Sequence, residues 1–545
     1  MLRSRWAGHS HGMPNDARTP PVTSPPRTTE SHWLRTTDST SYPPLAGNTT
    51  VDAVVVGGGI AGLSTAWELT RAGRSVAVLE ADRIASGVTG FTTAKLTAQH
   101  GLRYDRLRRT RGAEGAELYA RSQQAAVERV AEICAELDID CELERVPAYA
   151  YSRDTAQRPA LRAEAEAARA AGLDASYVES TGLPFTPAGA VRIDGQAQFH
   201  PRKYLLALAA DLTAYGNAIH ERTRVTGLRE GTPCQVTTEN GYTVTARDVV
   251  VATHFPVFDR ALLFTRMSPR RELVVAGPLP ADCDPDGMYI CEEGTKRSVR
   301  TAPLDDGSRL LIVTGESFTP GTADAGERFR RLEEWMHTHF PVTATRYRWA
   351  AQDNDPSDSV PLVGAFHPGA RHTFVATGFG GWGMSSGVMA GRLITDLICA
   401  VTPPWTRLYD PRRLWSALRE APTMLSQQAE VAQHFVGDRL RTTHVDSADD
   451  IPPGTGAVVR LAGRRSAVYR DEAGVCHAVS ARCTHLGCLV SFNAVERTWE
   501  CPCHGSRFGV DGSVLQGPAV HPLEQRDVDG AGGPDAAGSP DTEEP

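Results

Sequence analysis

The sequence lacks several features that define whole classes of protein. Its 545 residues hold no apolar run near the ~20 residues that a membrane-spanning helix needs, and the N-terminus lacks the apolar stretch of a secretory signal. The formal net charge is −8 and no basic stripe runs along the chain. We therefore expect no nucleic-acid partner and no membrane partner, and cytoplasmic is the default location.

Both ends of the chain are poor in apolar residues. Residues 1–41 are rich in Pro, Ser, Thr and Arg, and residues 527–545 are acidic and contain no Lys or Arg. Such segments bury too little apolar surface to fold, so we expect a mostly disordered N-terminal tail and an acidic disordered C-terminal tail. The overall composition, 41% hydrophobic and 22% charged, is ordinary for a globular protein, and the length predicts two or three domains.

The eleven cysteines are unevenly spread. Six are scattered singly and are expected to be buried apolar residues, whereas five lie between residues 476 and 503. A disulfide-rich secreted scaffold would distribute them through a short chain. The cluster therefore indicates a metal site.

Residues 51–80 carry the pattern of a dinucleotide-binding βαβ unit. A β-branched run ends at Val56, the motif Gly57-x-Gly59-x-x-Gly62 follows at once, and a helix and a second strand lead to Glu80. The glycines permit a tight turn, close approach of a pyrophosphate and close helix packing, and the helix N-terminus faces that pyrophosphate. Glu80 is expected to hydrogen-bond a ribose hydroxyl. This stretch does not decide which dinucleotide is bound.

The loop after Glu80 is rich in glycine and hydroxyl side chains, which suits contact with a flat ligand. Together with 223–225, 248–253 and the glycine-rich turn at 376–387, it resembles the FAD-dependent oxidoreductases of the D-amino-acid oxidase, glycine oxidase and sarcosine oxidase superfamily. The resemblance spans roughly residues 51–400. It implies that FAD contacts Gly57, Gly59, Ile60, Ala61, Gly62, Glu80, Ala81, Ser86, Gly87, Thr92, Thr93, Val225, Gly378, Gly380, Gly381, Gly383 and Met384.

The segment between these motifs predicts a second domain of helices and strands. Helices are expected near 113–137, 155–171, 202–215 and 329–340, a hairpin across Asn240-Gly241, and further strands near 273–276, 288–291, 298–301 and 310–313. No catalytic residue can be assigned. Side chains that could line a pocket, each more easily explained by a structural role, are His254, Tyr149, Tyr151, His200, Arg300 and Trp382, and Lys95 could lie near the flavin.

The C-terminal cluster has the pattern Cys483-x-His485, fifteen residues, then Cys501-x-x-His504. Two thiolates and two imidazoles suit zinc, but the first pair is too tight for the usual zinc knuckle. Both loops closely resemble those of the Rieske [2Fe–2S] domain. The resemblance implies that the cysteines hold one iron and the histidines the other, which raises the potential above that of an all-cysteine cluster.

Three further positions follow from the Rieske resemblance. Cys488 and Cys503 match the disulfide that links the two cluster loops in respiratory and photosynthetic Rieske proteins. Ser506 matches a serine that donates a hydrogen bond to the cluster. Phe508 stands where high-potential members have tyrosine, so we predict a lower potential than theirs, to be checked by voltammetry.

The predicted fold is an α/β FAD-binding domain of the glutathione-reductase-like Rossmann type with an interleaved α+β substrate domain, followed by an all-β Rieske domain. The expected boundaries are 1–41 for the N-terminal tail, 42–408 for the flavin part, 409–445 for a connecting region, 446–526 for the Rieske domain and 527–545 for the C-terminal tail.

Two functions fit these cofactors. In the first, a small amine, amino acid or related small-molecule donor reduces FAD, and the Rieske cluster passes the electrons to an unidentified acceptor, for which a protein is one candidate. In the second, NAD(P)H or a protein donor reduces FAD, and the chain is an electron-transfer module for a partner oxidoreductase. No convincing second dinucleotide motif supports the second function.

Overall fold

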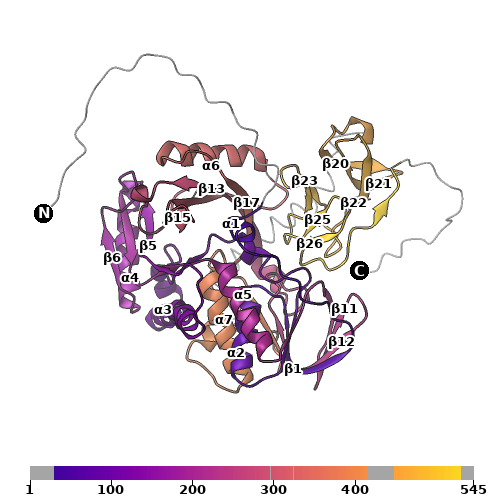
Figure 1. Cartoon of the computed structure of the whole chain (residues 1–545), viewed down its shortest axis with the longest axis horizontal. Coiled ribbons are helices and arrows are strands. Elements are labelled where there is room, and N and C mark those ends of the chain that lie inside the picture. The colour runs from indigo at the N-terminus through magenta and orange to yellow at the C-terminus, as the bar shows by residue number, and fades with distance from the viewer. Residues whose placement is uncertain (1–29, 295, 323, 414–446, 529–545) are drawn as a thin grey trace, which may run out of the picture.

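The computed structural model describes residues 30–294, 296–322, 324–413 and 447–528 (Figure 1). Most of the predicted connecting region and of the acidic C-terminal tail therefore lies outside the described residues. None of the helices in these ranges combines the length and apolar character needed to cross a bilayer.

The nucleotide-binding sheet is built around the apolar strand predicted from the sequence. Strand β1 (Thr49–Val56) pairs in parallel with β12 (Thr243–Val251) on one side and β2 (Val76–Leu79) on the other. The last four residues of β1 are buried, as expected for a central parallel strand. The sheet also contains β9 (Ala218–His220), β10 (Val225–Arg229), β11 (Cys234–Thr238), β18 (Leu362–Ala365) and β19 (Thr373–Thr377).

Helix α2 (Ile60–Arg71) starts at the glycine turn and is buried from Ile60 to Thr70. It is enclosed because α5 (Pro201–Ala214) and α7 (Gly383–Ile398) pack beside it, as Figure 1 shows. The predicted helix near 202–215 is thus present as α5. Helices α1 (His32–Arg35) and α8 (Thr406–Tyr409) are single turns.

A second sheet forms the substrate domain. Its order is β17-β13-β16-β15-β14-β5-β7-β6, and helix α6 (Ala325–His339) packs on β13 and β16. The segments that build it lie between strands of the nucleotide sheet, which confirms the interleaved architecture. Its strands are β5 (Ala148–Ser152), β6 (Ala175–Val178), β7 (Gly189–Ile193), β13 (Met267–Leu279), β14 (Met288–Cys291), β15 (Arg297–Pro303), β16 (Arg309–Phe318) and β17 (Tyr347–Pro356).

Two long helices and a small sheet complete the flavin part. Helix α3 (Tyr104–Glu136) packs against α4 (Arg158–Ala170) and α7. The small sheet has the order β3-β8-β4, made of β3 (Lys95–Leu96), β8 (Ala197–Gln198) and β4 (Glu144–Arg145).

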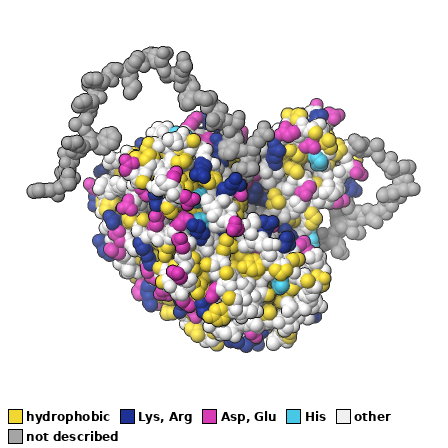
Figure 2. Space-filling view, viewed as in Figure 1, with side chains coloured by type: hydrophobic (Ala, Val, Ile, Leu, Met, Phe, Trp, Pro, Cys, Tyr) yellow, Lys and Arg dark blue, Asp and Glu magenta, His cyan; other side chains and the backbone are white. Residues whose placement is uncertain are grey.

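The C-terminal domain consists of two four-stranded antiparallel sheets, which confirms the all-β Rieske fold. One has the order β20-β21-β22-β27, made of β20 (Thr455–Leu461), β21 (Arg464–Arg470), β22 (Cys476–Ser480) and β27 (Gln525–Arg526). The other contains β23 (Ser491–Asn493), β24 (Thr498–Glu500), β25 (Arg507–Gly509) and β26 (Val514–Gln516). Figure 2 shows this domain as a separate lobe, with charges of both signs mixed over the visible face of the molecule.

A buried ion-pair network joins the two lobes. Arg271 of β13 is fully buried and pairs with Glu496 and Glu500 of the Rieske domain. Arg507 reaches Glu496 at 3.0 Å, and the backbone N–H of Gly321 donates to Glu500 at 3.0 Å. Burial would raise the pKa of Glu496, but the charges of Arg271 and Arg507 outweigh it and hold that pKa at about 2. The network therefore stays charged at neutral pH.

The N-terminal tail differs from the expectation. Residues 30–41 were predicted to be disordered, but α1 packs on the flavin domain and Trp33 is fully buried. The indole N–H of Trp33 donates to the carbonyl of Thr92 at 2.7 Å, and Ser31 caps α1. The buried ring of Trp33, whose N–H has a hydrogen-bond partner, anchors this segment, although the composition of the segment alone predicts disorder. Residues 1–29 lie outside the described part of the chain.

Candidate functional site: a flavin cavity beside a Rieske centre

The glycine turn after β1 has the tight geometry that its sequence predicts. Gly57 has φ +107°, and a Cβ there would lie 2.4 Å from the carbonyl oxygen of Ala252. A Cβ on Gly62 would lie 1.8 Å from the carbonyl oxygen of Gly57. Helix α2 therefore starts directly against the strand, and its first turn faces the space beyond the sheet.

That space is a cavity of about 750 Å³ lined by most of the residues predicted to contact FAD. The cavity-lining members of that set are Gly57, Gly59, Ile60, Ala61, Glu80, Ala81, Ser86, Gly87, Thr92, Thr93, Val225, Gly381, Gly383 and Met384. The other three do not line it. Gly62 lies in the first turn of α2 on the face toward Gly57 and Val55. A Cβ on Gly378 would face Pro356 and Met267, and Gly380 lines a neighbouring pocket.

The cavity fits a dinucleotide. Helices α2 and α7 begin at Gly59 and Trp382 without a side-chain cap, so both N-termini keep backbone donors for an anionic or electron-rich ligand. Glu80 lines the cavity and accepts the N–H groups of Gly58 at 2.7 Å and Asp82 at 2.9 Å. Burial raises the pKa of Glu80. Its predicted bond to a ribose stays a prediction.

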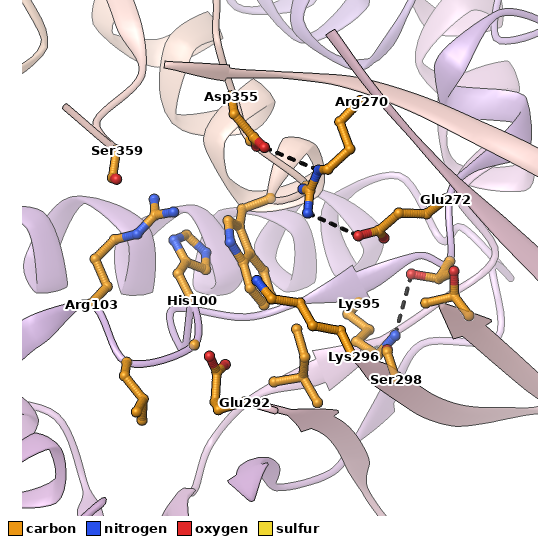
Figure 3. Close-up of a pocket in the computed structure, with 18 of the residues that line it drawn as sticks. Lys95, His100, Arg103, Arg270, Glu272, Glu292, Lys296, Ser298, Asp355 and Ser359 are labelled. Carbon is orange, nitrogen blue, oxygen red and sulfur yellow. Dashed lines mark hydrogen bonds and ion pairs between the residues drawn. The ribbon is translucent and has the colours of Figure 1, made fainter. Parts of the chain in front are cut away.

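A second pocket, of about 410 Å³, adjoins the flavin cavity (Figure 3). Both cavities are lined by Thr92, Thr93, Arg270, Glu272, Thr314, Gly381 and Met384. Trp382 stands in the pocket with its ring stacked on His100, at 4.6 Å between centroids and 20° between planes. We call this space the donor pocket.

At the inner end of the donor pocket, next to the flavin cavity, one arginine forms ion pairs with two carboxylates. Arg270 reaches Glu272 at 2.9 Å and Asp355 at 3.0 Å, as the dashed lines in Figure 3 show. Lys95 donates to Thr93 at 3.3 Å. Burial, with the nearby charge of Arg300, lowers the pKa of Lys95 to about 7. Lys95 can therefore gain or lose a proton near neutral pH.

The outer end is lined by Arg103, Arg106, Glu292 and Lys296 and does not reach the flavin cavity. Arg103 donates to the hydroxyl of Tyr119 at 2.7 Å, and Arg106 donates to Ser359 at 2.8 Å. Burial raises the pKa of Glu292, and the charges of Lys296 and Arg103 partly oppose that effect. Both ends of the pocket are thus strongly charged.

Of the pocket candidates named from the sequence, His254 lines the flavin cavity, and Trp382 and Lys95 line the donor pocket. The other four line neither cavity and have structural partners. Tyr149 stacks on Tyr289 at 4.7 Å, and Tyr151 is buried beside Cys291. His200 caps α5 and contacts Thr36 at 3.0 Å, and Arg300 donates to backbone carbonyls, including that of Ala94 at 2.7 Å.

Sequence reasoning missed most of the charged lining of the donor pocket. Arg270 and Glu272 are alternate residues of β13, and Asp355 is the residue before the last of β17, the strand that pairs with β13. Charged residues within otherwise apolar strands were the available signal. No local sequence pattern indicated that Arg103 and Glu292 would line the same pocket as these residues.

The two predicted cluster loops share one backbone design. In the first, the N–H of Cys483 donates to the carbonyl of Cys488 at 2.8 Å, and in the second the N–H of Cys501 donates to that of Ser506 at 2.8 Å. The fifth residue of each loop is a glycine with positive φ, 75° at Gly487 and 78° at Gly505. Matching turns therefore present two pairs of ligands toward one another.

The predicted ligand side chains converge. The rings of His485 and His504 lie 5.0 Å apart and nearly perpendicular, at 88°. His504 Nδ1 is buried and has no hydrogen-bond partner among the described residues. A hydrogen bond from Cys501 lowers the pKa of Cys483 to about 7, against the effect of burial, which favours the thiolate that binds iron.

The disulfide Cys488–Cys503 is present and links the two loops. The sulfurs of Cys488, Cys501 and Cys503 lie within 4.8 Å of one another, but the disulfide leaves only Cys501 of these as a thiolate ligand. Ser506 accepts the N–H of Ala519 at 3.0 Å and hydrogen-bonds Cys483. The donor set of two cysteines and two histidines thus fits a [2Fe–2S] cluster.

The flavin domain covers the histidine side of the cluster loops. Phe255 lies 5.7 Å and Phe264 also 5.7 Å from the ring of His504, and His485 Nε2 is 3.5 Å from Asp259. His254, the residue before Phe255, lines the flavin cavity. Rieske residues close the same cavity, namely Arg507, Val514, Leu515, Gln516, Gly517, Ala519 and Val520.

A dinucleotide cavity that adjoins a two-cysteine, two-histidine centre defines an FAD-dependent oxidoreductase with an attached Rieske cluster. Comparison with known proteins confirms this class. The family model for FAD dependent oxidoreductases matches residues 52–397, and the Rieske [2Fe-2S] domain model matches residues 441–527. The chain belongs to the FAD dependent oxidoreductase family and carries a C-terminal Rieske domain, so the predicted cofactors, FAD and a [2Fe–2S] cluster, are confirmed.

Three relatives show the extent of the similarity. The YhfW protein of Bacillus subtilis (strain 168), named for a Rieske 2Fe-2S centre, is 34% identical over 504 residues, which cover 92% of this chain and 98% of YhfW. Gamma-glutamylputrescine oxidoreductase of Escherichia coli (strain K12) is 25% identical over 363 residues, 64% of this chain and 84% of that protein. Glycine oxidase from Geobacillus kaustophilus shares the fold, with a TM-score of 0.55 at 21% identity over 67% of this chain and 99% of its own.

Proposed function

We propose that the protein oxidises a small amine, amino acid or related donor in the donor pocket and passes the electrons from flavin to the Rieske cluster and then to an external acceptor, for which a protein is one candidate. When bound, FAD accepts two electrons and the cluster carries one at a time. Oxidation of such a donor breaks one C–H and one N–H bond, forms a C=N bond, and releases two electrons and two protons.

The observation that carries this proposal is the junction between the two cofactor sites. His254 lines the flavin cavity, and the next residue, Phe255, contacts the ring of the cluster ligand His504. Consecutive Cα atoms are 3.80 Å apart, so one short segment borders both sites. An attached cluster placed there supports electron transfer within the chain.

The chain's own residues suit an amine donor. Lys95 Nζ has a pKa of about 7 and lines the donor pocket, so its neutral form can accept the proton that an ammonium donor must lose before oxidation. When Lys95 is neutral, Glu272 and Asp355 outnumber Arg270, so the inner end is net negative and favours an approaching ammonium group. The name of the Escherichia coli relative also indicates an amine derivative.

The test is anaerobic mixing of the oxidised holoprotein with a panel of amines and amino acids, and separately with NADH and NADPH. We expect an amine to bleach the flavin absorbance, followed by the electron paramagnetic resonance signal of the reduced cluster. Bleaching by a nicotinamide alone would instead identify the electron-transfer module. Flavin bleaching without cluster reduction would contradict the relay.

A further inference from the structure

We propose that the outer end of the donor pocket binds a carboxylate of the substrate, so that the donor is an amine whose carboxylate lies remote from the oxidised C–H bond. This inference rests on the proposed function, because it takes the pocket to be the place where the donor binds. It adds a charge requirement at a second position, which the family resemblance does not supply.

Charge is unevenly distributed along the donor pocket. At the inner end, Arg270 is already paired with Glu272 and Asp355. At the outer end, Arg103 and Lys296 form no ion pair within 4.0 Å with any carboxylate in the described ranges, 30–294, 296–322, 324–413 and 447–528.

Glu292 is the acidic residue that lines the outer end. Burial raises the pKa of Glu292, and the charges of Lys296 and Arg103 partly oppose that rise. The charge of Lys296 also acts on Asp355 at the inner end, where it partly opposes the effect of burial on that pKa. Arg106 adds a third cation, so the outer end keeps a positive surplus. With Lys95 neutral, the inner end has a negative surplus of one carboxylate.

This polarity orients a zwitterionic donor. The amine end is attracted to Glu272 and Asp355 beside the flavin cavity, and the carboxylate end to Arg103 and Lys296. Guanidinium and ammonium groups form charge-assisted hydrogen bonds with carboxylates, and these are stronger than bonds between neutral groups. A simple alkylamine satisfies only the inner end. An amine that carries an acid group at its far end satisfies both.

The first experiment measures binding without turnover. The oxidised holoprotein is titrated with straight-chain alkanoates from butanoate to octanoate, and binding is followed as a perturbation of the flavin absorbance. We expect saturable binding, weakened about tenfold or more by Lys296→Met, since one charge-assisted contact is removed. Glu292→Gln should have the opposite effect and tighten binding, because it removes a repelling charge.

The opposite signs separate recognition of charge from damage to the fold, which would weaken binding in both variants. Arg109→Met is the control, because Arg109 lies in the first turns of α3, which begins directly after Arg103, but is exposed and paired with Asp105 outside the pocket. This variant should bind alkanoates like the parent. Absence of alkanoate binding, or equal affinity in the parent and Lys296→Met, would overturn the inference.

The second experiment uses turnover. Each ω-amino acid from 4-aminobutanoate to 6-aminohexanoate is compared with the alkylamine of the same length. We expect the acids to have the lower KM, and Lys296→Met to raise the KM of the acids alone while kcat changes little. Equal KM values for the two series would refute the inference and leave the proposed function standing. Alkanoate binding with no bleaching by any amine would refute the proposed donor class and support the charged outer end.

Discussion

Single residues set the dimensions of the flavin cavity. The turn between β1 and α2 has no room for a side chain at Gly62, because its Cβ would meet the carbonyl of Gly57, and backbone atoms cannot move aside as the end of a long side chain can. The clash is therefore transmitted to the start of α2 and to the cavity beyond it.

We predict that Gly62→Ala destabilises the fold by about 3 kcal/mol and lowers FAD occupancy. Flavin absorbance of the purified protein and its thermal unfolding midpoint measure both effects. Gly47→Ala is the control, since a Cβ at Gly47 would meet nothing within 4 Å. Full FAD occupancy in Gly62→Ala would show that the turn relaxes more easily than this geometry indicates.

The pH dependence of flavin reduction tests directly whether Lys95 accepts the proton of the donor. The folded pKa of Lys95 is about 7, below the ordinary 10.5, so the neutral amine is populated as pH rises through 7. We predict that the limiting rate of anaerobic flavin reduction by the donor rises through about pH 7 and then levels off. Lys95→Met should remove this transition and slow the reaction about 100-fold.

A parallel variant, Lys203→Met, should keep the pH transition, because Lys203 pairs with Glu142 and does not line the donor pocket. If the transition survived unchanged in Lys95→Met, another group would have to be the proton acceptor.

At the scale of secondary-structure elements, β13 connects the donor pocket and the Rieske domain. Arg270 and Arg271 are neighbours on one strand, so their side chains point to opposite faces of the sheet. Arg270 faces the donor pocket, whereas Arg271 pairs with Glu496 and Glu500, and Glu500 directly precedes the predicted ligand Cys501. The strand is therefore a rigid connection between the pocket and a cluster loop.

We predict that Arg271→Met loosens the Rieske domain at a cost of about 3 kcal/mol, because Glu496 and Glu500 lose the fully buried cation they share and Arg507, at 3.0 Å and 3.5 Å, must balance both. Flavin reduction by the donor should persist, while stopped-flow spectroscopy should show slower reduction of the cluster. Arg129→Met is the control, since Arg129 pairs with Glu68 within the flavin part. An unchanged rate of cluster reduction in Arg271→Met would exclude a positioning role.

The elements also show what sequence can and cannot predict. The hairpin at Asn240-Gly241 and strand β14 appear where the local patterns place them, because turn residues and apolar runs act over a few positions. The donor pocket depends instead on pairing between β13 and β17, whose residues are some 80 positions apart in the chain, with Ser268 opposite Asp355. No local sequence pattern determines the register of the pairing between β13 and β17. The burial of Trp33 is non-local for the same reason.

At the scale of the whole molecule, the flavin site is complete only when the C-terminal domain is docked. We predict that reductive titration of the anaerobic holoprotein takes three electron equivalents per chain, two for FAD and one for the cluster. The flavin absorbance and the paramagnetic resonance signal, followed together, give this count. A protein that took up two equivalents while containing both cofactors would show that the cluster is cut off from the flavin.

The Rieske segment that lines the flavin cavity has a consequence for biogenesis. Residues from Val514 to Val520 form part of the cavity wall, although they are synthesised some 450 residues after the glycine turn. A nascent chain can present the turn long before this wall exists, so we expect FAD to enter while the cavity is open and to be enclosed when the Rieske domain folds over it. We therefore expect flavin retention to depend on maturation of the iron–sulfur centre, and a shortage of iron in the cell should leave a chain that loses its flavin as well.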